Sequence, residues 1–132
     1  MKYYVASGVQ NAERVNIAAD VLNARGFLRT YDWTKHGSVS AAPDETKHTV
    51  AAAEASAVQE AELIVLLLPG GFGTHAELGL AIASKANKRI LLWSETEEPF
   101  VGKRDFCVFY HHPSVERFIC PFNQLLQFLA TL

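Results

Sequence analysis

The sequence is poor in the residues that mark several large classes of protein. Its two cysteines, Cys107 and Cys120, have neither metal-ligand nor CxxC spacing. We therefore expect two thiols in a reducing compartment, and neither a disulfide framework nor a metal site. The chain also lacks the long hydrophobic core of a signal peptide and any apolar run long enough to cross a bilayer. These absences predict a cytoplasmic protein with no membrane partner.

The sequence also has no large excess of positive or negative charge. Twelve basic and fourteen acidic residues leave a formal net charge of −2, and no basic run stands out. The electrostatic pattern of a protein that binds duplex nucleic acid is therefore absent, and we expect no nucleic acid polymer as a partner. Apolar residues make up 49% of the 132 residues and charged residues 20%, which is typical of an ordinary globular protein. This length predicts one domain, residues 1–132, with a proper core.

Segments typical of strands alternate with segments typical of helices. Short apolar or β-branched runs predict strands at residues 3–6, 27–31, 63–68, 89–93 and 106–110. Helical spacing or alanine-rich composition predicts helices at residues 11–25, 45–61 (or from 49), 74–86 and 121–132. Gly26 would stop the first helix in a left-handed conformation. The alternation predicts a doubly wound, mainly parallel five-stranded α/β sheet, Rossmann-like or flavodoxin-like, with helices on both faces.

Ligands of such sheets bind beyond the carboxyl ends of the strands, where the predicted loops 7–11, 32–36 and 69–75 lie. The loop at 69–75 is rich in glycine, which lets the backbone approach a ligand closely. The helix after it presents unpaired N–H groups and the positive end of its dipole. A phosphate, carboxylate or sugar can bind there. The spacing fits neither GxGxxG nor a Walker loop, so we expect no dinucleotide, ATP or other cofactor.

Two roles fit Glu77. With Thr74 it has the spacing of a capping box, in which the two side chains only complete the start of a helix. Alternatively, its carboxylate lies on the first helical turn beside a glycine-rich pocket. There it can attack a sugar carbon that becomes positive as a base departs. The residues alone leave both roles open.

The run from Gly73 to Ala81, GTHAELGLA, resembles the helix start of the nucleoside 2-deoxyribosyltransferase family, which includes the 2′-deoxynucleoside 5′-phosphate N-hydrolases. The resemblance extends over residues 4–93. It implies that Glu77 is the nucleophile, that Tyr4 hydrogen-bonds to it, and that Glu54 replaces an aspartate that contacts the sugar or assists the leaving base. It further implies cleavage or transfer of the N-glycosidic bond of a nucleoside or nucleoside 5′-monophosphate, by a homo-oligomer (a dimer or higher).

Other residues are candidates for contacts with this small-molecule substrate. The loop at 7–11, with Arg14 just beyond it, can hold a 5′-hydroxyl or a phosphate. Asp32 and Trp33 end the second predicted strand, and Trp33 can stack on a base; packing fits it equally well. Gly71 stands where the family often has aspartate or serine, so only backbone is offered there. The candidate substrate-binding residues are Ser7, Gly8, Asp32, Trp33, Gly70, Gly71, Gly73 and Thr74.

A second resemblance covers only nine residues. The run from Pro69 to Glu77, PGGFGTHAE, fits the PGGxGTxxE pattern of the cytokinin-activating phosphoribohydrolases. That family also carries an upstream arginine, whereas residues 36–77 contain none. Both families cleave N-glycosidic bonds on a Rossmann-like sheet, so the expected reaction class is the same. A non-catalytic nucleotide-binding module remains the alternative from another class.

Overall fold

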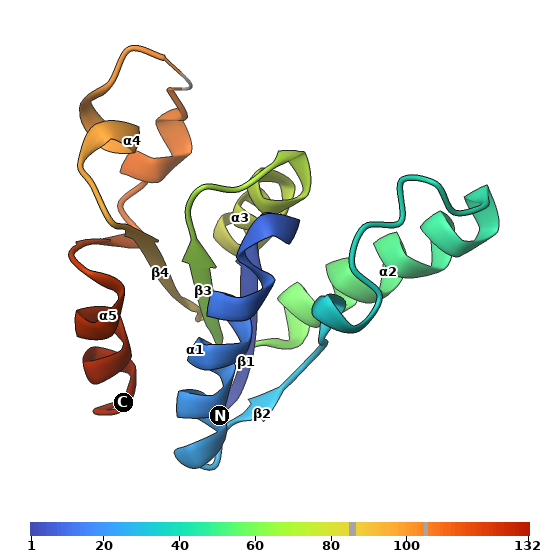
Figure 1. The fold of residues 1–132 in the computed structure, drawn as a ribbon, viewed down its shortest axis with the longest axis horizontal. Helices are drawn as coiled ribbons and strands as arrows, with labels where there is room; N and C mark the ends of the chain where they lie inside the picture. The colour runs from blue at the N-terminus through green and yellow to red at the C-terminus, as the bar shows by residue number, and fades with distance from the viewer. Residues whose placement is uncertain (85–86, 105) are drawn as a thin grey trace.

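A computed structural model of the chain describes residues 1–84, 87–104 and 106–132. Its five-stranded sheet has the order β2-β1-β3-β4-β5, and each neighbouring pair of strands is parallel (Figure 1). The strands are β1 (Lys2–Ser7), β2 (Leu28–Arg29), β3 (Leu63–Leu67), β4 (Arg89–Ser94) and β5 (Val115–Ile119). This order is flavodoxin-like, which confirms the predicted fold class. The strand order reverses between β1 and β3, and ligand sites of such sheets lie beyond that point.

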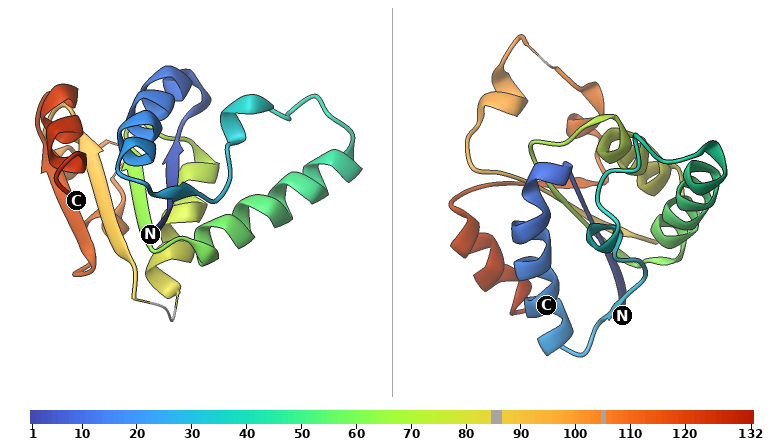
Figure 2. Two further views of the ribbon diagram at one scale, coloured as in Figure 1. Left: turned by 90° about the horizontal axis from the view of Figure 1, so that it is seen from below. Right: turned by 45° about the vertical axis from the view of Figure 1, so that its right-hand side comes forward.

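Helices cover both faces of the sheet. The α-helices are α1 (Ala12–Ala24), α2 (Asp44–Glu60), α3 (Phe72–Ala83), α4 (Glu98–Val101) and α5 (Phe122–Leu129). The 3-10 helices are η1 (Val9–Asn11), η2 (Trp33–Lys35) and η3 (Val108–His111). α1 and α5 lie against one face, and α2 and α3 lie against the other (Figure 2). Gly26 follows α1 with φ of +82°, which confirms the predicted left-handed stop.

The centre of the sheet forms as the apolar run at 63–68 predicts. All five residues of β3 are buried, because β1 and β4 pair with it on either side and helices cover both of its faces. α2, by contrast, packs mainly through its carboxyl-terminal half, where Ala57 and Val58 are buried. Its amino-terminal half extends away from the sheet (Figure 1). Within the described residues, no helix has the length and apolar character needed to cross a membrane.

The predicted fifth strand at 106–110 is wrong. Most of that segment is the 3-10 helix η3, and the edge strand is instead β5, at residues 115–119. Phe106, Val108 and Phe109 are 58%, 58% and 55% exposed, so most of this apolar run stays at the surface, whereas Tyr110 is buried in the core. Hydrophobic patterning does not predict β5, because an edge strand can carry polar residues. In β5, Glu116 pairs with Arg89 of β4.

Smaller differences concern the lengths of elements. The second predicted strand, 27–31, is reduced to the two residues of β2, and the predicted loop at 95–104 contains the short helix α4. The predicted end of the third helix at residue 86 lies outside the described residues. The start of this helix also differs from the prediction, and this difference changes the surroundings of Thr74 and Glu77.

Candidate functional site

The first turn of α3 is built differently from the predicted capping box. The helix starts at Phe72, two residues earlier than expected, and its N-cap is Gly71, which makes no side-chain capping bond. Thr74 is therefore the third helical residue and is buried against the loop before the helix. A methyl group at Gly70 would lie 2.5 Å from Thr74 Cγ2, so this close approach requires glycine at position 70. The capping role predicted for Thr74 and Glu77 is wrong.

Glu77 does not cap the helix and instead lies beside Tyr4 and Glu54. The Tyr4 hydroxyl lies 2.5 Å from Glu77 Oε2 and 3.3 Å from Glu54 Oε1, and the side chain of Glu77 is buried. The three residues come from β1, α2 and α3, which lie next to one another where the strand order reverses between β1 and β3. A phenol has one proton, so Tyr4 serves one carboxylate at a time. We call these three residues the carboxylate cluster.

The surroundings of the carboxylate cluster favour the neutral form of Glu77. The pKa of Glu77 is raised to about 8: burial is the largest cause and Glu54 adds to the rise, whereas the hydrogen bond from Tyr4 lowers the pKa. Burial, and then the neighbouring carboxylates, also raise the pKa of Tyr4, which keeps it a proton donor. A buried carboxylate whose pKa lies near physiological pH is typical of catalytic sites.

The loops that follow β1 and β3 are bonded to each other. Ser7 Oγ donates to the backbone oxygen of Leu67 at 2.7 Å, and the Gly8 N–H donates to the oxygen of Pro69 at 3.4 Å. The structure thus brings the predicted residues Ser7 and Gly8 to the glycine-rich loop, at the ligand edge of the sheet.

Asp32 and Trp33 occupy structural positions. Asp32 accepts from the Thr34 N–H at 3.0 Å and pairs with Arg29, also at 3.0 Å. Trp33 is buried, and its indole N–H donates to the backbone oxygen of Val5 at 2.8 Å. Trp33 therefore ties the segment after β2 to β1, whereas Asp32 is engaged with residues of its own segment. For Trp33, this arrangement favours packing over stacking on a base.

A cavity of about 710 Å³ lies between the glycine-rich loop and the segments that follow β4. Its walls include Arg14, Gly70, Phe72, His75, Trp93 and Tyr110. Glu77, Tyr4 and Glu54 are not among its lining residues. His75 and Glu77 are two positions apart on α3, so they project from opposite flanks of the helix. The cavity and the carboxylate cluster therefore occupy opposite flanks of α3.

Two contacts shape this cavity. His75 bridges Gly71 and Tyr110: its Nδ1 lies 2.7 Å from the Gly71 oxygen and its Nε2 lies 2.5 Å from Tyr110 Oη. The guanidinium of Arg14 stacks over Trp93 at 5.5 Å from the ring centroid. Trp93 could have been found from the sequence, because it ends a predicted strand at the ligand edge. Tyr110 was placed in a strand that does not form.

The described residues contain no group of three or more His, Cys, Asp or Glu side chains that could hold a metal ion.

Comparisons with known proteins support the fold. No protein-family model matches the sequence, and no curated protein matches it. The chain is structurally similar to the CMP N-glycosidase BcmB of Clostridium botulinum, with a TM-score of 0.68 and 20% sequence identity. The match covers 98% of this chain and 98% of the other. At this identity the similarity establishes the shared α/β fold.

Proposed function

We propose that the protein cleaves the N-glycosidic bond of a nucleoside or nucleoside 5′-monophosphate, with Glu77 as the nucleophile. The observation that carries this proposal is a buried carboxylate hydrogen-bonded to the Tyr4 phenol at the ligand edge of a flavodoxin-like sheet. A structurally similar protein is described as a CMP N-glycosidase, which supports the reaction class and a nucleotide as substrate. The resemblance of residues 73–81 to the nucleoside 2-deoxyribosyltransferases supports the role of Glu77.

In the proposed mechanism, ionised Glu77 attacks C1′ of the sugar. The C1′–N bond breaks, and its electron pair leaves with the base, which takes a proton from Glu54 or from water. Tyr4 donates to one oxygen of Glu77 and so orients the other toward C1′. Water then breaks the glycosyl ester in a hydrolysis, or a second base breaks it in a transfer. In both cases, Glu77 leaves as a carboxylate.

A second candidate is a phosphoribohydrolase that acts on a ribonucleoside 5′-monophosphate. All nine residues from Pro69 to Glu77 fit the pattern of that family. The missing upstream arginine weighs against it. A third candidate is a non-catalytic nucleotide-binding module, which would use the glycine-rich loop to bind a nucleotide without turning it over.

The homo-oligomer and the cytoplasmic location remain predictions. The proposed oligomer is supported by the exposed apolar side chains of Val101, Phe106, Val108 and Phe109 and by the extended half of α2. Both features offer surface to a second copy of the chain.

The test is a panel of nucleosides and nucleoside 5′-monophosphates, with the released base followed by chromatography. Adding a competing free base separates transfer from hydrolysis. We expect Glu77→Gln to release base at least about 10³-fold more slowly than the unmodified chain, as expected when a nucleophile is removed. Glu62→Gln is the matched control, because Glu62 is exposed at the opposite edge of the sheet, where it accepts from the Lys2 N–H. Equal rates for Glu77→Gln and the unmodified chain would contradict the proposal, and tight nucleotide binding without turnover would favour the binding module.

A further inference from the structure

We propose that Tyr31 binds the nucleobase of the substrate through its phenol hydroxyl, beside Glu54. This inference rests on the proposed function and names the residue of that same site that determines affinity for the base. Asp32 and Trp33, which follow Tyr31 in the sequence, use their polar groups to bind other parts of the chain. The contact with the base expected of Trp33 is thereby assigned to Tyr31.

The proposed reaction determines where the base lies. The base is bonded to C1′, which Glu77 attacks, and it lies within reach of the Glu54 carboxyl that can protonate it. Glu54 projects from α2 and Glu77 from α3, and both lie within hydrogen-bonding distance of the Tyr4 hydroxyl. The base therefore lies on the side of α3 that faces α2, and the cavity of 710 Å³ lies on the opposite flank.

Open space next to Glu77 leaves room for the sugar. Gly73 lies four positions before Glu77 in α3, so the two residues share one flank of the helix and are one turn apart. Gly73 is exposed, and a methyl group there would meet no atom within 4 Å. A sugar can therefore approach Glu77 over bare backbone at the start of α3.

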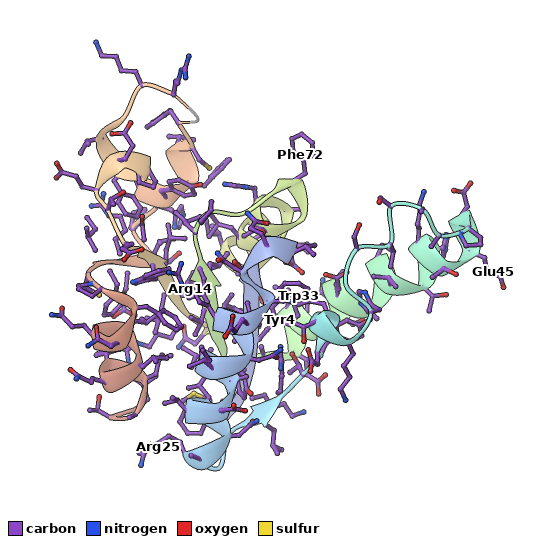
Figure 3. The ribbon with its side chains drawn as sticks, viewed as in Figure 1. Tyr4, Arg14, Arg25, Trp33, Glu45 and Phe72 are labelled. Atoms are coloured by element: carbon purple, nitrogen blue, oxygen red, sulfur yellow. The ribbon has the colours of Figure 1, made fainter. Side chains whose placement is uncertain are left out.

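Hydrogen bonds hold Tyr31 next to the turn of α2 that carries Glu54. Thr30 Oγ1 donates to the backbone oxygen of Ala57 at 3.0 Å, and Ala57 follows Glu54 by one helical turn. Two residues after Tyr31, the Trp33 indole N–H donates to the backbone of β1 at 2.8 Å (Figure 3). The chain on either side of Tyr31 is therefore anchored, at α2 and at β1.

The hydroxyl of Tyr31 is available to a ligand. Within the described residues, the hydroxyls of Tyr3 and Tyr4 are hydrogen-bonded, whereas that of Tyr31 has no hydrogen-bond partner. Tyr31 is only half-buried, so a ligand can reach it. Its ring lies against His36, with 5.7 Å between the centroids. The side chain thus offers a hydrogen-bonding group that the fold itself does not use.

The Tyr31 phenol keeps its proton and lies near Glu54. Burial raises the pKa of this hydroxyl, and the carboxylates of Glu54 and Asp32 raise it further. A protonated phenol can donate to a carbonyl oxygen or ring nitrogen of a base, and it can accept from an amino group. Tyr31 and Glu54 would then contact the edge of one base, Glu54 at the atom that takes the proton and Tyr31 at a neighbouring atom.

Calorimetric titration of the Glu77→Gln variant with the panel of nucleosides and nucleoside 5′-monophosphates tests the inference without turnover. Adding Tyr31→Phe should weaken the binding of at least one panel member about threefold to tenfold, as expected for the loss of one hydrogen bond. Ribose 5-phosphate, which has no base, should show no difference. In the otherwise unmodified chain, Tyr31→Phe should raise KM by the same factor and change kcat less than about twofold.

Tyr3→Phe is the matched control. It makes the same chemical change on the other face of the sheet, where the Tyr3 hydroxyl donates to Asn23 at 2.8 Å. This variant should bind the panel as its parent does.

Two results would overturn the inference: an affinity that Tyr31→Phe leaves unchanged for every panel member, or an equal loss of affinity for ribose 5-phosphate. Failure of the proposed function is distinguishable. If binding depends on Tyr31 but the unmodified chain releases no base, only the proposed function fails. If base is released but Tyr31→Phe changes neither affinity nor KM, only the inference fails. If no panel member binds and no base is released, both fail.

Discussion

Replacing Glu77 by glutamine should stabilise the protein at high pH. The pKa of this carboxyl is about 8 in the folded chain against an ordinary value of 4.5. The folded state therefore binds a proton more tightly than the unfolded state does. Glu77 contributes its full stability below about pH 4.5, and this contribution is lost as pH rises through about 8. The shift in pKa corresponds to on the order of 5 kcal/mol, at about 1.4 kcal/mol for each pKa unit.

Glutamine cannot ionise, but it retains an oxygen that accepts from Tyr4. We therefore expect the unfolding free energies of Glu77→Gln and the unmodified chain to agree within about 1 kcal/mol near pH 4.5. At pH 9 the variant should be more stable by several kcal/mol, up to on the order of 5 kcal/mol. Urea denaturation followed by tryptophan fluorescence from pH 4.5 to 9 measures this difference, with Glu62→Gln as the control. A difference that stays constant across that pH range would refute the argument that burial raises the pKa of Glu77.

Three further predictions concern single side chains. Tyr4→Phe removes the hydrogen bond that lowers the pKa of Glu77, so the rate of base release should fall about tenfold to a thousandfold. In a pH–rate profile, the rise of this rate with pH should move to higher pH, and an unchanged profile would contradict the prediction. Gly79→Ala should raise the unfolding free energy, measured by thermal unfolding, by about 1 kcal/mol, because Gly79 is exposed inside α3 with open space around it. Gly70→Ala should lower the unfolding free energy by about 1–3 kcal/mol, because the added methyl group would clash with Thr74. Trp33→Phe loses its bond to the β1 backbone and should cost about 1 kcal/mol of stability without changing KM for the substrate; a raised KM would instead mean that Trp33 contacts the substrate.

The sequence predicts the sheet well where hydrophobic patterning and burial agree. The apolar run at 63–68 becomes the buried central strand, and Gly26 ends its helix as expected. Patterning fails at 106–110, where Phe106, Val108 and Phe109 stay at the surface and no strand forms. It also fails at β5, where an edge strand is partly polar. The start of α3 was misplaced because Thr74 and Glu77 match a capping pattern, whereas the chain uses Gly71 as the N-cap.

The candidate site was predictable only in part. The structure gathers Glu77, Tyr4 and Glu54, which the family resemblance had singled out, and their catalytic roles remain predictions. The cavity depends on contacts between distant segments, such as the bridge from His75 to Tyr110. No local pattern encodes such a contact, because it forms only when the segment after β4 folds back over the start of α3.

One phenol positioned between two carboxylates has a consequence for how mutants of this protein should be interpreted. Because Tyr4 has a single proton to offer, removing any member of the trio changes the hydrogen bonding of the other two. The losses from single substitutions will therefore not add up, and none of them can be assigned to one side chain. A double-mutant cycle over Glu54 and Glu77, repeated with and without the tyrosine hydroxyl, is needed to separate their contributions.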